Sequence, residues 1–356
     1  MIPLYKPYVA SELNELNNIL YSGNLSYGKW GKKFEKELGN YIGNYQILTT
    51  NSYNSAMLVL LETLNIKPGD KIIASPMSCL ASNQPFATQG INIIWSDIDP
   101  YTGTLDPEKV RSLISKDVKA IFHNHFCGYV GYVDEINAIG KEHGITIIDD
   151  AIEAFGSSYK NNMMGNLGSD CTIFSFETIR MPNCINGGGI TFKNKDNFKT
   201  ASLVRDYGVE RNSFRNNSGE IKKEIDIKIA GFGAMPNEIS SYVGSMHLKK
   251  INSLLKKQKK NSSKWYKYFE NYDGIFPSLN ITKNSNPNYW VYGLLSQNKK
   301  NTIIEMRQKG FYASGVHMNN NNYSAFGNKI ELKGVKSFME KFVAIPCGWW
   351  MDAIQE

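Results

Sequence analysis

Residues 145–156 read ITIIDDAIEAFG, in which a short β-branched apolar run stops at two aspartates. The run predicts a buried strand over residues 145–148, with both carboxylates at its carboxyl end. Similar runs recur between longer helical segments and cover residues 47–50, 71–74, 91–95, 120–123, 172–176 and 189–192. This alternation predicts an α/β fold with a mostly parallel sheet flanked by helices. Ligands bind such sheets at the carboxyl ends of strands, so Asp150 is a candidate functional residue, although an aspartate there can also simply cap a helix.

The chain changes character beyond about residue 235. We expect a long helix from residue 237 to about 269, then a polar stretch rich in Asn and Lys near 278–288, then short strands and helices. The sequence therefore predicts a large domain over residues 1–235 and a smaller C-terminal α+β domain over residues 236–356.

The composition is that of an ordinary globular chain of 356 residues, with 42% hydrophobic residues, 21% charged residues and a net charge of +7. No window approaches the ~18 consecutive apolar residues of a membrane span, and the start of the sequence lacks a signal-peptide pattern. We therefore expect a cytoplasmic protein without a membrane span. Much of the positive charge falls in a lysine-rich segment over residues 249–267, which we expect to be a solvated helix face and not a nucleic-acid site.

The spacing of cysteine and histidine does not indicate a metal site. The five cysteines are odd in number and none forms a C-x-x-C pair, so neither a disulfide framework nor a zinc site is indicated. His123 and His125 would point to one face of a predicted strand, but the sequence alone assigns them no acidic or cysteine partner. We expect no bound metal.

Short motifs occur in a fixed order along nearly the whole chain. They are residues 2–7 (IPLYKP), 22–28 (SGNLSYG), 34–35 (FE), 67–73 (KPGDKII), 97–100 (DIDP), 125–128 (HFCG), 149–156 (DDAIEAFG), 205–208 (RDYG), 236–239 (PNEI) and 316–318 (VHM). This ordered set resembles the DegT/DnrJ/EryC1/StrS family of fold type I enzymes that use pyridoxal phosphate (PLP), most of which are aminotransferases acting on nucleotide-linked keto sugars. The resemblance implies the fold type I architecture. It also implies a homodimer, because such proteins generally build each active site from two subunits.

Where residues match the family's motifs, the resemblance implies their roles. Asp150 corresponds to the aspartate that pairs with the pyridine nitrogen of the cofactor, and Ser175 corresponds to a serine near the cofactor phosphate. Ser52 lies in the segment that wraps the phosphate, and His317 lies in a substrate-side motif.

Several residues depart from the family pattern, and the departures cluster on the cofactor. Tyr53 and Asn54 replace the glycine and threonine of the phosphate loop, and Leu80 falls where many relatives place an aromatic that stacks on the ring. Glu153 replaces a histidine or glutamine near the cofactor hydroxyl. Gly233 replaces an asparagine that reaches the neighbouring subunit's cofactor.

The resemblance aligns Arg180 with the lysine that holds the cofactor as a Schiff base. No lysine occurs between Lys160 and Lys193, so a small shift of the alignment supplies none. A PLP enzyme needs a lysine amine at this position. A guanidinium stays protonated and offers no free lone pair, so Arg180 cannot take that role.

Three functions are open on this basis. By the weight of the family, the chain is a sugar-nucleotide aminotransferase-like protein of surface-polysaccharide or modified-sugar biosynthesis, with Arg180 in place of the lysine and with PLP or pyridoxamine phosphate (PMP) as cofactor. One alternative is a lysine-less, PMP-dependent deoxysugar dehydratase, in which Glu177 supplies the base; His317 is the third catalytic candidate. The other alternative is an enzyme or binding protein without PLP, in which Arg180 holds a phosphate or carboxylate. A non-catalytic partner that binds a sugar nucleotide belongs to the same class.

Overall fold

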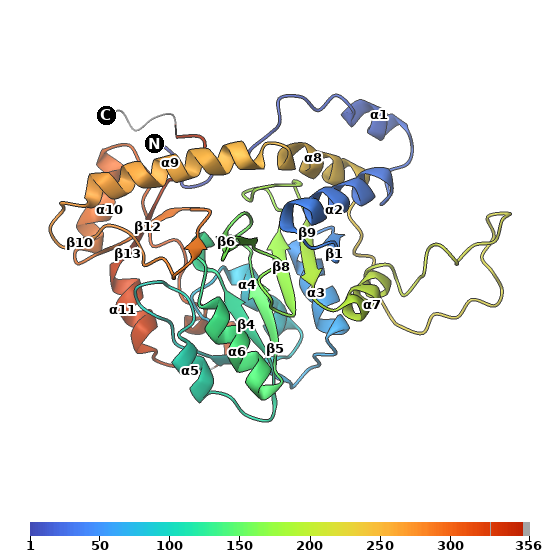
Figure 1. The fold of residues 1–356 in the computed structure, drawn as a ribbon, viewed down its shortest axis with the longest axis horizontal. Coiled ribbons are helices and arrows are strands. Elements are labelled where there is room, and N and C mark those ends of the chain that lie inside the picture. Colours follow the sequence, from blue (N-terminus) through green and yellow to red (C-terminus); the bar gives the residue numbers. More distant parts are fainter. Residues whose placement is uncertain (328, 352–356) are drawn as a thin grey trace.

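The computed structural model describes residues 1–327 and 329–351. Its centre is a seven-stranded sheet with the strand order β1-β9-β8-β5-β4-β2-β3 (Figure 1). The strands are β1 (Ile47–Thr50), β2 (Lys71–Ala74), β3 (Asn92–Trp95), β4 (Val118–Asn124), β5 (Thr146–Asp150), β8 (Cys171–Ser175) and β9 (Gly188–Phe192). The pairs from β3 through β2, β4 and β5 to β8 are parallel, whereas β9 is antiparallel to both β8 and β1. The predicted α/β fold with a mostly parallel sheet is confirmed.

Helices cover both faces of this sheet, because successive strand residues point to opposite sides. Ile148 of β5 shares a hydrophobic cluster with residues of α3 (Tyr53–Thr63), α4 (Leu80–Thr88) and α7 (Lys195–Arg205). Its neighbour Ile147 belongs to the opposite cluster, with α5 (Pro107–Ser112) and α6 (Val133–His143). A third cluster packs α2 (Lys29–Ile42) on the same face as Ile147, toward the β1 end of the sheet. Both faces are buried, which explains why the strands read as continuous apolar runs.

The C-terminal part adds a smaller antiparallel sheet in the order β10-β12-β13. Its elements are β10 (Ile275–Phe276), β12 (Tyr292–Ser296), β13 (Phe342–Ile345), α10 (Lys299–Gln308) and α11 (Lys333–Lys341). The start of the chain joins this part, since Ile2 forms a β-bridge with Phe311. The remaining short elements are α1 (Leu16–Tyr21), η1 (Phe126–Gly128), β6 (Ser158–Tyr159), β7 (Asn162–Met163), β11 (Ser285–Asn286), η2 (Asn320–Asn322) and η3 (Ser324–Phe326). Because β11 pairs with β6, the C-terminal part also contributes a strand beside the large sheet.

The long helix expected from residue 237 to 269 is instead two helices, α8 (Glu238–Leu248) and α9 (Ile251–Phe269), which follow one another along one side of the molecule (Figure 1). They meet at Lys249 and Lys250, where the Lys250 N–H bonds to the carbonyl of His247 in an i to i−3 pattern. Most of α8 is buried, whereas the exposed face of α9 carries the lysines. The helix breaks where the chain passes from the buried α8 to the half-exposed α9, and the hydrophobic pattern did not predict this break.

Residues 206–237, between α7 and α8, contain no helix or strand and extend away from the body of the molecule (Figure 1). The backbone of this segment forms isolated β-bridges, such as the one between Arg215 and Ile221. Within the described part of the chain, none of the helices combines the length with the apolar composition that crossing a bilayer requires.

Candidate functional site

Tyr53 and Asp150 meet at the carboxyl end of β5. Asp150 is the last residue of β5 and is 2% exposed, and Tyr53, the first residue of α3, is 1% exposed. The Tyr53 hydroxyl donates to Oδ1 of Asp150 at 3.3 Å, and the Ile152 N–H donates to the same oxygen at 3.2 Å. Burial raises the pKa of Asp150 to about 6. Burial, together with the nearby Asp150, raises the pKa of Tyr53 well above its ordinary value, so the phenol stays protonated and acts as the donor.

Arg180 lies in a buried ion pair close to this contact. Its side chain is 7% exposed, and Nη1 lies 3.5 Å from Oε1 of Glu153. The guanidinium stacks on the ring of Trp290 at 4.7 Å, and Nη2 lies 3.9 Å from Sγ of Cys79. Burial by itself would raise the pKa of Glu153, but His317 and Arg180 hold that pKa below its ordinary value, so Glu153 is ionised. Arg180 is therefore a buried cation that Glu153 neutralises.

His317 connects the ion pair to solvent. Its Nε2 lies 2.9 Å from Oε1 of Glu153, and its side chain is 17% exposed. The second carboxylate oxygen of Glu153 accepts the N–H of Cys127 at 2.9 Å. The imidazole also lies parallel to the ring of Trp290, with centroids 6.3 Å apart. His317 is the partly exposed titratable group of this cluster, so it is the one that can exchange a proton with a ligand.

The other predicted cofactor residues lie around the Tyr53–Asp150 contact and the Arg180–Glu153 ion pair. Ser52 caps α3, with its Oγ accepting the N–H of Ser55 at 3.0 Å, and Asn54 is exposed. Ser175 is buried at the end of β8, where its Oγ accepts the N–H of Glu177 at 3.4 Å. Their roles toward a cofactor stay predictions.

Two further candidates, Glu177 and Leu80, lie at the edge of the cluster, and their roles also stay predictions. The half-buried Glu177 meets Arg180 through the backbone, its carbonyl accepting the Arg180 N–H at 2.9 Å, and the arginine side chain pairs with Glu153 instead. Leu80 is 41% exposed. In this segment it is the side chain of Cys79 that reaches Arg180. Cys79 is the N-cap of α4, and Leu80 is the first residue of that helix.

Four residues of the cluster were absent from the predicted site, namely Cys79, Ser82, Cys127 and Trp290. Cys79 is a neighbour of both Asp150 and Arg180, and Ser82 lies beside Asp150. Burial, followed by the nearby Glu153, raises the pKa of Cys79, so its sulfur stays a thiol. The position of Cys79 and Ser82 just past a predicted strand could have marked them as site residues. Nothing in the sequence around Trp290 marked it in the same way.

A separate buried cluster joins His123, His125 and Asp149, and it supplies the acidic partner that the sequence could not assign. Their ligand atoms lie within 4.8 Å of one another. Nδ1 of His125 accepts the Gly131 N–H at 3.0 Å, so in the neutral ring the proton sits on Nε2, which lies 3.2 Å from Oδ1 of Asp149. A nitrogen that carries a proton cannot ligate a metal. Burial would raise the pKa of Asp149, but His125 and His123 hold it well below its ordinary value. Nδ1 of His123 lies 3.2 Å from the same Oδ1 of Asp149, whereas Nε2 of His123 and Oδ2 of Asp149 are buried without a hydrogen-bond partner among the described residues.

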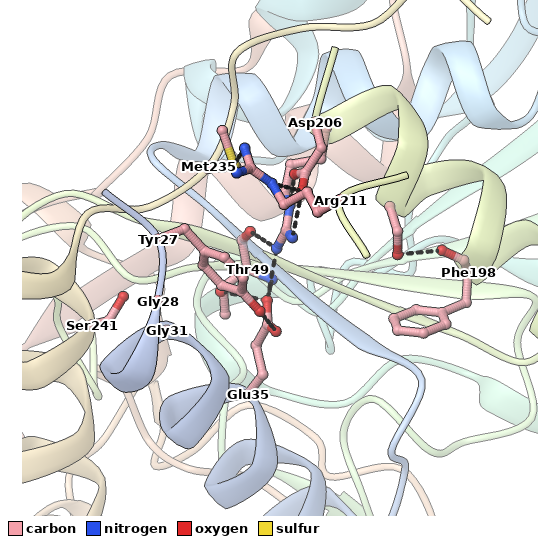
Figure 2. Close-up of polar contacts among 12 residues, drawn as sticks. Tyr27, Gly28, Gly31, Glu35, Thr49, Phe198, Asp206, Arg211, Met235 and Ser241 are labelled. Atoms are coloured by element: carbon pink, nitrogen blue, oxygen red, sulfur yellow. Dashed lines mark hydrogen bonds and ion pairs between the residues drawn. The ribbon is translucent and has the colours of Figure 1, made fainter. Parts of the chain in front are cut away.

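The RDYG motif at residues 205–208 forms a third buried charge cluster (Figure 2). Arg205 donates to Glu35 at 2.9 Å and to Asp206 at 2.6 Å, and Arg211 donates to Asp206 at 2.7 Å. The hydroxyl of Tyr27 donates to Glu35 at 2.5 Å, and Arg205 also donates to the Thr49 carbonyl at 3.2 Å. These contacts tie α2, β1 and α7 together just ahead of the Ser52 cap, so the motif positions the start of α3.

Comparisons with known proteins agree with this architecture. The sequence model of the DegT/DnrJ/EryC1/StrS aminotransferase family matches residues 8–352. The uncharacterized protein MJ1066 of Methanocaldococcus jannaschii is 28% identical over 295 residues, which are 83% of this chain and 76% of the relative. The spore coat polysaccharide biosynthesis protein SpsC of Bacillus subtilis is 25% identical over 275 residues, 77% of this chain and 70% of the relative. The crystal structure of the sugar aminotransferase CalS13 from Micromonospora echinospora superimposes with a TM-score of 0.91 at 23% identity, covering 99% of this chain and 96% of the other. The fold type I architecture is thereby confirmed.

An aminotransferase family implies PLP or its amine form PMP, and the residues present do not fit the ring of either. Oδ1 of Asp150, the aspartate expected to pair with the pyridine nitrogen, already accepts the Tyr53 hydroxyl at 3.3 Å. Asp150, Glu153, Ser175 and Arg180 are each at most 6% exposed, so protein atoms already surround the groups that would line the ring. Arg180 also offers no amine for the covalent link. This site is a buried cluster in which Arg180 pairs with Glu153 and Tyr53 contacts Asp150.

Proposed function

Because this chain belongs to the DegT/DnrJ/EryC1/StrS aminotransferase family, we propose that it binds a nucleotide-linked sugar in surface-polysaccharide or modified-sugar biosynthesis and does so without a lysine-bound cofactor. One observation carries the second half of the proposal. Arg180, which the family resemblance aligns with the Schiff-base lysine, is a buried cation paired with Glu153 at 3.5 Å and stacked on Trp290. The polysaccharide context is supported by the relative SpsC, whose name places it in spore coat polysaccharide biosynthesis.

The two earlier alternatives fare differently against this geometry. A PMP-dependent dehydratase needs room for the cofactor ring at Asp150, where the Tyr53 hydroxyl lies at 3.3 Å. A protein without PLP needs no such room, so we favour it. Arg180 is already neutralised by Glu153 and nearly inaccessible, so we do not assign it the role of holding a ligand anion.

We assign proton exchange with the bound sugar to His317. It is the partly exposed member of the cluster, and the ionised Glu153 lies 2.9 Å behind it. Such an imidazole and carboxylate pair can take up a proton from a sugar hydroxyl, or from the carbon next to a sugar keto group, and return it.

Calorimetric titration of the purified protein with UDP-linked and dTDP-linked sugars tests the binding, with the free nucleotides and free sugars as controls. We expect saturable binding of a nucleotide-linked sugar. The protein is then incubated with PLP, glutamate as amino donor and a nucleotide-linked keto sugar. We expect no amino sugar by mass spectrometry, and amino-sugar formation would overturn the proposal. His317→Gln should retain sugar binding and lose any exchange of sugar C–H hydrogens with deuterated water.

We also propose that the chain forms a homodimer, as fold type I proteins generally do. Residues 206–237 extend from the body of the molecule (Figure 1) and expose large apolar side chains, including Tyr207, Ile221, Ile227 and Phe232. Exposed apolar side chains gathered on one extended segment favour burial against a partner. Light scattering coupled to gel filtration should give the mass of two chains, and a monomer at micromolar concentration would contradict the proposal.

A further inference from the structure

The phenol ring of Tyr53 lies between the two anchor points that a pyridoxal ring requires. One anchor is the N-terminus of α3, where helix N–H groups can hold a phosphate, and Tyr53 is the first residue of that helix. The other anchor is Asp150, which the Tyr53 hydroxyl reaches at 3.3 Å. A cofactor bound by its phosphate and its ring nitrogen would have to span the same two points. We infer that the side chain of Tyr53 takes the place of the cofactor ring and acts as a built-in plug of the ring site.

The hydrogen bond at the far end of the plug matches what the ring would supply. A protonated pyridine nitrogen donates to the aspartate, and the protonated Tyr53 hydroxyl donates to Oδ1 of Asp150 in the same sense. Asp150 thus keeps a donor partner in the absence of any cofactor. Oδ1 of Asp150 also accepts the Ile152 N–H at 3.2 Å, so this oxygen has two donors from the protein itself.

The walls of the ring site are closed over the plug. Tyr53 is 1% exposed and Ser82 is fully buried. Tyr53 belongs to the same hydrophobic cluster as Ala56 and Phe86, and Cys79 packs against that cluster. Glycine at position 53 would leave no side chain in this space, so the cluster would lose a whole aromatic ring. The plug therefore also acts as a core side chain.

Two obstacles to the cofactor are therefore separate in space and in kind. Arg180 offers no amine for the covalent link to the cofactor. Tyr53 fills the space that the cofactor ring would need, and its hydroxyl occupies Oδ1 of Asp150, the expected partner of the ring nitrogen. Restoring a lysine alone should not restore cofactor binding. The inference concerns the cofactor ring alone and is independent of the sugar ligand proposed above, whose titration uses neither PLP nor these variants.

The experiment compares PLP binding by the wild-type protein, Arg180→Lys, Tyr53→Gly and the double variant Tyr53→Gly/Arg180→Lys. Each protein is incubated with PLP and freed of excess by gel filtration. In the double variant the new amine condenses with the PLP aldehyde to an imine, with loss of one water. We expect a visible absorbance band there, and one cofactor mass per chain after borohydride reduction. The wild type and Arg180→Lys should show neither.

The matched control is Tyr53→Phe/Arg180→Lys, which keeps the ring, removes only the hydroxyl and should bind no PLP at the site. Stoichiometric binding by the wild type, by Arg180→Lys or by this control would overturn the inference. So would a folded double variant that binds none.

Removing a buried aromatic can also prevent folding, so a second measurement uses Tyr53→Ala with added phenol, which has the shape of the missing ring. We expect phenol to raise the melting temperature of Tyr53→Ala and to leave the wild type unchanged. If the glycine variants do not fold, this rescue together with the absence of binding by Arg180→Lys supports the plug. Binding by Arg180→Lys overturns it.

Discussion

The buried carboxyl group of Asp150 should make the stability of this protein depend on pH in an unusual direction. Burial raises its pKa from an ordinary value of 3.8 to about 6. Between about pH 4 and pH 6 the folded state keeps a proton on Asp150 that the unfolded state has already released. The folded state therefore loses stability as pH rises through this window. At about 1.4 kcal/mol per pKa unit, the loss is up to about 3 kcal/mol.

The perturbation that isolates this effect is Asp150→Asn. The amide keeps an oxygen that can accept from Tyr53 and Ile152, but it has no proton to release. Urea denaturation of both proteins at pH 4, 5, 6, 7 and 8 gives the free energy of unfolding of each. We expect the difference between variant and wild type to shift in favour of the variant by about 2 to 3 kcal/mol from pH 4 to pH 7. Taking the difference removes the contributions of other titrating groups.

Asp149→Asn is the matched control, because the adjacent aspartate is equally buried and its pKa moves in the opposite direction. His125 and His123 hold the pKa of Asp149 well below its ordinary value despite burial. Its stabilising contribution is thus present above the unfolded pKa and lost only in strong acid, so this variant should be clearly destabilised at pH 7. A difference between Asp150→Asn and wild type that stays constant within about 1 kcal/mol from pH 4 to pH 8 would refute the reasoning.

Three further changes test the cluster, each by urea denaturation at pH 7. Glu153→Gln leaves Arg180 as a buried cation without its partner and should lower the free energy of unfolding by about 3 to 5 kcal/mol; a loss under about 1 kcal/mol would argue against the ion pair. Tyr53→Phe removes one buried donor and should cost about 1 kcal/mol, whereas Tyr53→Ala should cost about 3 to 5 kcal/mol, and equal losses would contradict the packing role of the ring. Gly131→Ala would place a Cβ 2.2 Å from Nε2 of the buried His123 and should cost about 1 to 3 kcal/mol; an unchanged midpoint would contradict the close packing there.

The strands of the large sheet were predictable because each reads as a short apolar run; all but the partly buried edge strand β3 are largely buried on both faces. Asp150 was predictable for a related reason, since the residue after such a run must lie at the ligand-binding edge of the sheet. The break between α8 and α9 was not predictable, because helical periodicity continues through Lys249 and Lys250 while the packing around the helices changes.

The contacts that close the site join residues far apart in sequence, and this is why the sequence did not reveal them. Trp290 stacks on Arg180, and His317 reaches Glu153 across 164 positions. Tyr53 was marked only as a departure from a glycine. Its fully buried ring follows from the direction of the first side chain of α3, which the type of residue does not specify.

The unusual residues of the site form two buried contacts. Arg180, which the family resemblance aligns with a lysine, would be an uncompensated buried cation without Glu153. Oδ1 of Asp150 accepts the Tyr53 hydroxyl in addition to the Ile152 N–H, so Tyr53 adds a second donor to this buried carboxyl group. Breaking either contact by a single substitution is therefore expected to destabilise the fold, because it leaves a buried polar or charged group with fewer partners. On the two proposals made above, a functional conversion toward transamination would require both contacts to be changed together.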